Sequence, residues 1–209
     1  MLDLDAATAR AVVLGRQPAS AQRRLLIGLT GPPGSGKSTL GTRLVRALDG
    51  AAVLVPMDGF HLTQRELNRL GLHDRKGAPA TFDAGGYVTL LRRLRDNTEP
   101  VVHAPEFDRG LEEPVADAIA VPATAPIVVT EGNYLLLDQP PWAAVRQLLT
   151  EIWYCDVDED LRRARLLARH QEFGRSPREA RAWMGRVDDP NAVLIAGTRR
   201  AANYAVTIP

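Results

Sequence analysis

The residues of this chain that are best suited to chemistry lie in one short stretch, GPPGSGKST, at positions 31–39. The stretch fits the pattern G-x-x-x-x-G-K-[ST], in which backbone amides, a lysine and a hydroxyl surround phosphate groups. Small residues let the backbone approach a triphosphate closely, and the lysine reaches its β and γ oxygens as a point charge. The pattern therefore predicts a phosphate-binding loop for a nucleoside triphosphate, formed by Gly31, Pro33, Gly34, Ser35, Gly36, Lys37, Ser38 and Thr39.

The last residues of this stretch have distinct expected roles. Lys37 is one of only two lysines in the chain and holds the phosphates. The hydroxyl of Ser38 would bind Mg²⁺, and Thr39 would make a further phosphate contact. A helix that begins near Gly36 points the positive end of its dipole at the same phosphates.

A second candidate for chemistry is Asp58, at the end of the apolar run AAVLVPMD. Because the carboxyl ends of parallel strands share one edge of a sheet, Asp58 would lie across that edge from the loop. There its carboxylate would accept the proton of an attacking hydroxyl. The alternative is an aspartate that only opens a turn with Gly59. His61 lies three residues further on and would contact the same acceptor.

Elements that would position these residues are visible as apolar runs. Continuous rather than alternating apolarity indicates strands that are buried on both faces, and their alternation with helical patterns indicates a parallel sheet. The predicted fold is α/β, a P-loop NTPase three-layer sandwich with a five-stranded parallel sheet flanked by helices. The strands are expected at 24–30, 51–58, 125–132, 150–157 and 203–209. We expect one domain over 1–209, with an acceptor-pocket insertion at 83–122.

Composition narrows the class of protein further. A net charge of +1 gives no reason to expect nucleic acid or an anionic membrane as a partner, and no run of about 18 apolar residues is present. The single Cys155 excludes an internal disulfide and fits a reducing compartment, so we expect a cytoplasmic enzyme. The first 20 residues predict an amphipathic helix that packs on the sheet or on a partner subunit, which leaves a homodimer open.

Two absent or altered motifs bear on the reaction class. The chain contains no N-K-x-D tetrapeptide, which a GTPase would need to read guanine. The third predicted strand, IVVTE, ends in Glu131, where motor and transporter ATPases usually have aspartate. A small-molecule kinase is therefore favoured. The rival from another class is a nucleotide-binding regulator that uses the loop as a switch and transfers no phosphate.

Six motifs occur in an order that resembles a known family: GPPGSGKST, MDGFH, FDAGGYVTLLRRL, APEFDR, VVTEGNYLLL and RLLARHQEFGRS. Over residues 22–209 the chain is similar to the family that joins uridine kinase, phosphoribulokinase and bacterial pantothenate kinase. It most resembles a bacterial branch labelled as nucleoside or sugar kinases, including fructokinases and fructose-transport kinases. The resemblance implies ATP and Mg²⁺ as cofactors and an alcohol of a small polar metabolite as acceptor. A sugar is the first choice, a uridine- or cytidine-type nucleoside the second, and a pantothenate kinase-like enzyme a further alternative.

The resemblance also implies residue roles. Asp58 matches an aspartate that orients or deprotonates the acceptor hydroxyl, and Glu131 matches an acidic residue near the magnesium. The residues expected to bind the acceptor are Asp58, Phe60, His61, Phe107, Arg109 and Tyr134. His61 stands where uridine kinases have a tyrosine-type residue, which disfavours a pyrimidine nucleoside.

An arginine-rich segment follows the fourth predicted strand, and the family resemblance makes residues 159–187 a lid over ATP. Arg165 and Arg169 would stabilise the transferring phosphoryl group, and Arg175 would contact ATP. Which arginine does so stays open, and the alternative is an ordinary solvated helix face. Trp183 is expected to pack between helices, and His170 has no acidic or cysteine partner at metal-ligand spacing.

Overall fold

The computed structural model of the protein describes residues 1–16 and 24–209, and five of its strands form one parallel sheet in the order β2-β5-β1-β6-β7. These strands are β1 (Leu25–Thr30), β2 (Ala52–Pro56), β5 (Ile127–Glu131), β6 (Glu151–Asp156) and β7 (Tyr204–Thr207). The predicted parallel sheet is confirmed, and each strand lies within its predicted range. Residues 17–20 of the predicted N-terminal helix and residues 22–23 of the family resemblance lie outside the described residues.

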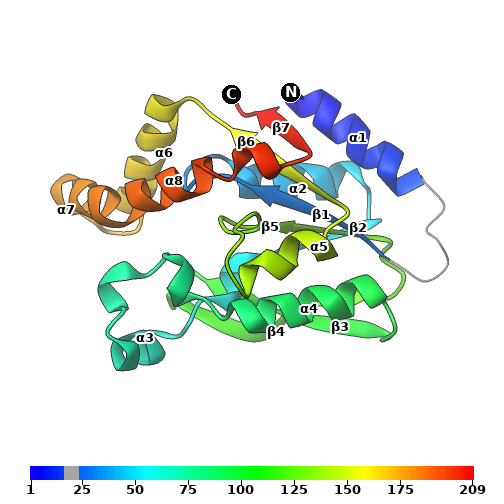
Figure 1. The fold of residues 1–209 in the computed structure, drawn as a ribbon, viewed down its shortest axis with the longest axis horizontal. Coiled ribbons are helices and arrows are strands. Elements are labelled where there is room, and N and C mark those ends of the chain that lie inside the picture. The colour runs from blue at the N-terminus through cyan, green and yellow to red at the C-terminus, as the bar shows by residue number, and fades with distance from the viewer. Residues whose placement is uncertain (17–23) are drawn as a thin grey trace.

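Helices cover both faces of the sheet (Figure 1). One face carries α1 (Leu4–Arg16) and α2 (Lys37–Ala47), and the other carries α4 (Ala84–Asp96) and α5 (Val145–Leu148). The two cores alternate along the strands, so that Val128 packs in the α4 core while its neighbour Val129 packs in the α2 core. The strands are thus buried on both faces, as continuous apolarity requires. The N-terminal helix α1 packs against the sheet, and its residues Ala7 and Ala11 are fully buried in that contact.

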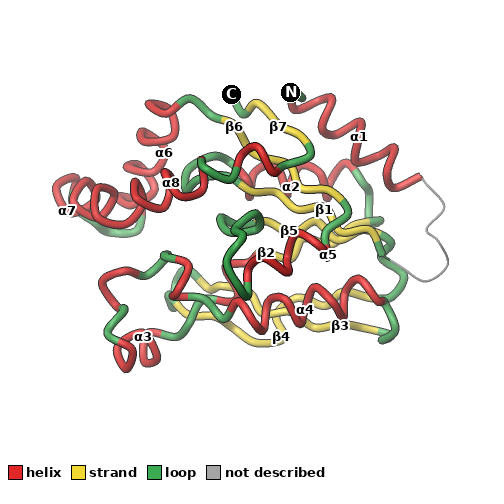
Figure 2. Tube along the Cα trace, viewed as in Figure 1, coloured by secondary structure: helices red, strands yellow, loops and turns green. Residues whose placement is uncertain are grey.

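Residues 57–81 and 159–188 lie at one end of the molecule, beyond the carboxyl ends of the strands (Figures 1 and 2). We call residues 159–196, which contain the predicted lid segment 159–187, the lid region. It consists of α6 (Glu159–Glu172), α7 (Pro177–Trp183), a π-helical turn η5 (Met184–Asp188) and α8 (Asp189–Ala196). Shorter elements are η1 (Met57–Phe60), α3 (Gln64–Leu70), η2 (His73–Arg75), η3 (Pro79–Thr81), η4 (Trp142–Ala144) and η6 (Arg199–Ala201). Ser176 caps α7 through a capping box with Glu179, as the sequence Ser-Pro-Arg-Glu suggests.

The segment predicted to form an acceptor-pocket insertion at 83–122 divides into two parts with different roles. Its first part is α4, whose Tyr87, Leu91 and Leu94 are buried in the core. The second part is an antiparallel hairpin, β3 (Val101–Asp108) and β4 (Glu113–Pro122), which was not among the predicted strands. The hairpin contributes Phe107 at the end of β3, and Arg109 and Glu112 of its turn, to the cavity beside the phosphate loop.

The hairpin is joined to the end of β2 by a close backbone approach at Gly59. A Cβ atom at this position would lie 2.2 Å from the carbonyl oxygen of Pro105 in β3. Backbone atoms cannot move aside as a flexible side chain does, so only glycine fits between η1 and the hairpin.

We therefore expect Gly59→Ala to lower the free energy of unfolding by about 1–3 kcal/mol, the usual cost of overpacking. Urea unfolding followed by circular dichroism measures the change. Gly85→Ala is the matched control because its nearest neighbour would be 3.7 Å away, and alanine in a helix is neutral or stabilising there. Equal stabilities of the two variants would contradict the close approach.

Among the described residues, no helix is both long enough and apolar enough to cross a membrane.

Candidate active site

The phosphate-binding loop connects the buried end of β1 to the first turn of α2, as predicted. Gly34 has φ of 85°, and a Cβ there would lie 2.8 Å from the carbonyl oxygen of Arg162. Both the left-handed backbone and the contact with α6 therefore require glycine. Ser38 and Thr39 lie in the exposed first turn of α2, where their hydroxyls are accessible to a ligand.

Lys37 is folded back over this loop rather than paired with a carboxylate. Its Nζ donates to the carbonyl oxygens of Gly31 at 2.9 Å and Pro32 at 3.1 Å. Burial lowers the pKa of Lys37, because the charged form has lost water. The hydroxyl of Ser35 is buried nearby without a hydrogen-bond partner among the described residues. An ammonium group and an unpaired hydroxyl inside a glycine loop fit a phosphate ligand.

Glu131 and Ser38 form the side of the loop that suits a metal ion. The Ser38 hydroxyl donates to Oε1 of Glu131 at 2.8 Å, so the end of β5 is joined to the first turn of α2. Burial raises the pKa of Glu131, and the nearby charge of Asp58 raises it further. Hydroxyl and carboxylate oxygens suit Mg²⁺, which usually completes its shell with phosphate oxygens and water. In keeping with this, the described residues contain no cluster of three side chains that would hold a metal alone.

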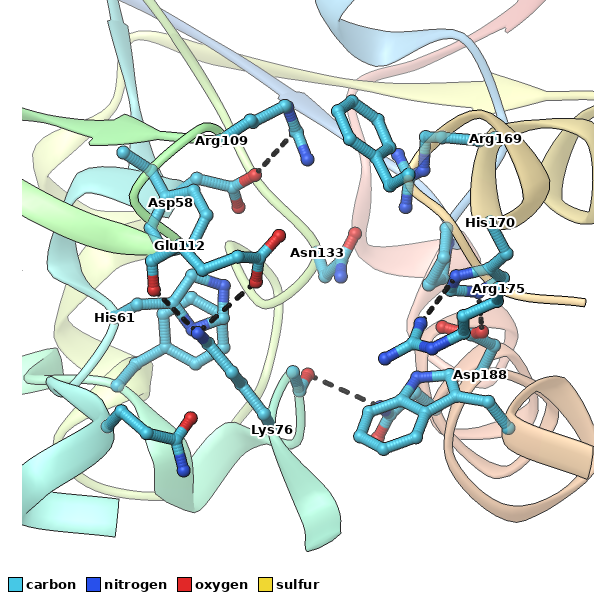
Figure 3. A pocket seen from close by; sticks show the side chains of 18 of the residues that line it. Asp58, His61, Lys76, Arg109, Glu112, Asn133, Arg169, His170, Arg175 and Asp188 are labelled. Atoms are coloured by element: carbon cyan, nitrogen blue, oxygen red, sulfur yellow. Dashed lines mark hydrogen bonds and ion pairs between the residues drawn. The ribbon is translucent and has the colours of Figure 1, made fainter. Parts of the chain in front are cut away.

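A cavity of about 500 Å³ opens beside the loop, between the sheet and the lid region (Figure 3). We call its two sides the sheet-side wall and the lid wall. The sheet-side wall consists of Asp58, His61, Lys76, Phe107, Arg109 and Glu112. The lid wall consists of Arg169, His170, Phe173, Arg175, Trp183 and Asp188. Pro33 of the loop and Asn133, just after β5, lie where the two walls meet.

Charges on the sheet-side wall are paired. Oδ2 of Asp58 lies 3.4 Å from a guanidinium nitrogen of Arg109, and the Asp58 side chain remains 32% exposed. Lys76 Nζ donates to the backbone oxygen of Glu112 at 2.7 Å and lies 3.4 Å from its carboxylate. The η1 turn holds Asp58 at the carboxyl end of β2, across the edge from the loop. Asp58 is thus accessible to an acceptor hydroxyl, with no unpaired cation on its own wall.

Aromatic rings complete the sheet-side wall. The imidazole of His61 stacks on Phe82 with ring centroids 4.0 Å apart, and the Phe107 centroid lies 4.9 Å away. Its Nδ1 is buried and has no hydrogen-bond partner among the described residues. Burial lowers the pKa of His61 to about 4, although Asp58 acts in the opposite direction. The ring is therefore neutral at physiological pH.

This lowered pKa has a measurable effect on stability. In the unfolded chain His61 has a pKa of about 6.5 and binds a proton below that pH. In the folded chain the same side chain binds a proton only below about pH 4. We therefore expect His61 to make the protein less stable as the pH falls from about 6.5 to about 4. Urea titrations across this range should show a smaller loss for His61→Asn than for the wild type. His103→Gln, on an exposed part of β3, is the control, and an unchanged slope in His61→Asn would contradict the burial argument.

Arg165 and Arg169 are four residues apart in α6, a spacing that places them on one helical face, but their side chains make different contacts in the structure. Arg169 lines the cavity and forms no ion pair among the described residues. Arg165 does not line it, and instead donates to the backbone oxygen of Pro209 beside Gly36. Arg162 is buried; it pairs with Glu159 within α6 and attaches α6 to Asp189 and to the Pro33 carbonyl. Arg169 is thus the arginine of α6 that faces the cavity.

Two of the predicted acceptor contacts lie in the core instead. Phe60 is buried with its ring edge against Tyr87, and Tyr134 is fully buried, with its hydroxyl donating to the Gly77 carbonyl. Asp58, His61, Phe107 and Arg109 are brought together as expected.

Several cavity residues are not among the predicted site residues. Lys76 and Glu112 belong to turns whose meeting depends on the hairpin, and Asn133 lies within the motif VVTEGNYLLL but has no predicted role there. Trp183, expected as a packing residue, contacts Arg175, and His170 has a carboxylate partner in Asp188.

Comparisons with known proteins identify the family to which the chain is similar. The model of the "Phosphoribulokinase / Uridine kinase family" matches residues 26–180. A Schizosaccharomyces pombe protein named "Putative uridine kinase C227.14" is 40% identical over 162 residues, which is 73% of this chain and 69% of that protein. Escherichia coli "Uncharacterized protein YggC" is 36% identical over 91% of this chain and 80% of its own length. A crystal structure from Silicibacter sp. TM1040, described as a "putative fructose transport system kinase", has a TM-score of 0.87 at 36% identity and covers 99% of this chain and 98% of its own.

Proposed function

Because the chain belongs to the phosphoribulokinase and uridine kinase family, whose members are ATP-dependent kinases, we propose that its acceptor is an uncharged sugar. The observation that carries this proposal is the charge pairing of the sheet-side wall. Arg109 faces Asp58 and Lys76 faces Glu112, so no cation on this wall is free for a carboxylate or a phosphate on the acceptor. The unpaired guanidinium groups of Arg169 and Arg175 lie on the opposite wall, where they suit the phosphates of ATP.

The polar atoms that remain on the acceptor side suit hydroxyl groups. Asn133 offers both a donor and an acceptor to an alcohol. The faces of His61 and Phe107 provide apolar surface for the carbon skeleton. A nucleoside would use the same features, with its base on the aromatic rings, and it is the second candidate because of the 40% identical relative named as a uridine kinase.

Transfer would follow from the positions of the chain's own groups. The acceptor O–H bond breaks as the Asp58 carboxylate takes its proton, and the freed oxygen forms a bond to the γ phosphorus. The bond from that phosphorus to the bridging oxygen breaks, and ADP leaves with the electron pair. Lys37 and the loop amides hold the β and γ oxygens, while Arg169 faces the developing charge. Magnesium held by Ser38 and Glu131, partly through water, would supply further neutralisation of the phosphates.

An acceptor panel measured by coupled ADP release tests the proposal. It compares fructose and other free sugars with uridine and cytidine, and with two anionic acceptors, pantothenate and ribulose 5-phosphate. We expect a free sugar to give the highest kcat/KM and both anionic acceptors to be at least about tenfold poorer, since an unpaired buried charge costs more than about 1.4 kcal/mol. A nucleoside as the best acceptor would overturn the sugar, and an anionic acceptor as the best would overturn the charge argument.

A further inference from the structure

Arg175 is held in the lid wall by two uncharged side chains. Its NH1 lies 2.7 Å from Nδ1 of His170, and its guanidinium carbon lies 4.3 Å from the centre of the Trp183 ring (Figure 3). Among the described residues, no carboxylate forms an ion pair with it. The guanidinium group is therefore fixed on two sides and keeps its full positive charge.

This contact defines the state of the histidine. A guanidinium can only donate hydrogen bonds, so Nδ1 of His170 must accept, and the ring proton must be on Nε2. That Nε2–H then donates to Oδ2 of Asp188 at 2.8 Å. A doubly protonated His170 would place a second donor and a second charge against Arg175. The sequence of contacts thus runs from Asp188 through a neutral imidazole to Arg175.

The local fold provides for this arrangement. Asp188 ends the π-helical turn η5, and its side chain is buried against the end of α6. The next residue, Asp189, points the other way, with its carboxylate bonded to Arg162 and Arg163. A π turn changes the angular spacing of a helix and is frequently found at functional sites. Here it directs one of two adjacent aspartates into the cavity lining.

We infer that His170 is a positioning residue, which with Asp188 holds Arg175 toward the terminal phosphate of ATP without neutralising its charge. A carboxylate at position 170 would also hold the guanidinium, but it would cancel the charge that the phosphate needs. An imidazole holds the same group by a hydrogen bond alone. The inference rests on the proposed contact between Arg175 and ATP, and it adds the residues that orient Arg175.

Two substitutions separate the contacts of His170. His170→Asn keeps an acceptor oxygen at the position of Nδ1, and so keeps the bond to Arg175. His170→Gln keeps a donor at the position of Nε2, and so keeps only the bond to Asp188. The readout is the ratio of dissociation constants for ADP and for the non-hydrolysable analogue adenylyl imidodiphosphate, both with Mg²⁺, measured by calorimetry. This ratio reports contacts with the terminal phosphate and does not require an acceptor.

We expect His170→Gln to lower the preference for the analogue by about tenfold, as Arg175→Ala does, and His170→Asn to change it by less than about threefold. The double variant Arg175→Ala, His170→Gln should be no worse than Arg175→Ala alone, since His170 acts through Arg175. Equal losses in His170→Asn and His170→Gln, or additive losses in the double variant, would mean that His170 only supports the fold.

A spectroscopic measurement tests the contacts independently of ATP. The ¹⁵N spectrum of the His170 ring should show the neutral Nε2–H form in the wild type. An Nδ1–H form in the wild type overturns the inference. An unchanged ADP-to-analogue ratio in Arg175→Ala overturns it as well, whereas phosphate transfer to a sugar by that variant would leave the proposed function intact.

Discussion

Asp58→Asn is expected to lower kcat by about 10²- to 10⁴-fold, the usual contribution of a positioned general base. Asparagine has the same shape and keeps an oxygen for the 3.4 Å contact with Arg109, but its amide cannot take the hydroxyl proton. The dissociation constant for ATP should stay within about twofold of the wild type, because Asp58 belongs to the sheet-side wall and not to the phosphate loop. Steady-state kinetics with the best acceptor and calorimetry with ATP give the two values.

The matched control is Asp138→Asn, an exposed aspartate that lies outside the cavity lining. It removes the same charge and should leave kcat unchanged. If Asp58→Asn retained more than a tenth of the wild-type kcat, Asp58 would not be the base. A nucleotide-binding regulator would show no acceptor-dependent kcat in the wild type, and Asp58→Asn would leave its ATP affinity unchanged.

Arg169→Ala is expected to lower kcat by about 10³-fold or more, since an arginine that stabilises a transferring phosphoryl group contributes about 10³ to 10⁵. Arg169 lies in the lid wall opposite Arg109, and no carboxylate pairs with it among the described residues (Figure 3). Loss of water around the guanidinium lowers the pKa of Arg169, and the charge of Arg109 lowers it further. Arg109 is paired with Asp58, whereas Arg169 has no carboxylate partner among the described residues, so an anionic ligand would stabilise the charge of Arg169.

Single-turnover measurements at saturating ATP isolate the chemical step for this variant. Arg169→Lys should recover only part of the rate, because lysine keeps the charge but loses the planar fork of donors. Arg178→Ala, in α7 and outside the cavity lining, is the control and should react at the wild-type rate. A loss confined to the acceptor KM, with the single-turnover rate intact, would show that Arg169 binds the acceptor and not the phosphoryl group.

The sheet and the phosphate loop could be predicted from the sequence because their signals are local. Five continuous apolar runs mark strands that are buried on both faces, and the order of glycines, lysine and serine in 31–39 is demanded by close phosphate contact. The position of Asp58 also follows, because it comes directly after β2 and the carboxyl ends of parallel strands share an edge.

The cavity lining could be predicted only in part because most of it depends on contacts between distant segments. Periodicity places Arg165 and Arg169 on one face of α6, but the position of Pro209 decides which of them faces the cavity. The bond between His170 and Asp188 spans 18 residues and depends on a π turn, for which the sequence has no recognised pattern. Tyr134 follows Glu131 closely in sequence, yet its ring enters the aromatic core.

The destination of the γ phosphate tests the central claim most directly. A ³¹P NMR spectrum of the protein with MgATP and the best acceptor of the panel follows that phosphate through the reaction. For the wild type we predict one phosphomonoester signal, on an uncharged acceptor, that grows at the same rate as ADP. With Asp58→Asn this signal should be nearly absent. ADP accompanied only by inorganic phosphate, or a phosphomonoester formed equally fast by Asp58→Asn, would contradict transfer to an acceptor hydroxyl at this aspartate.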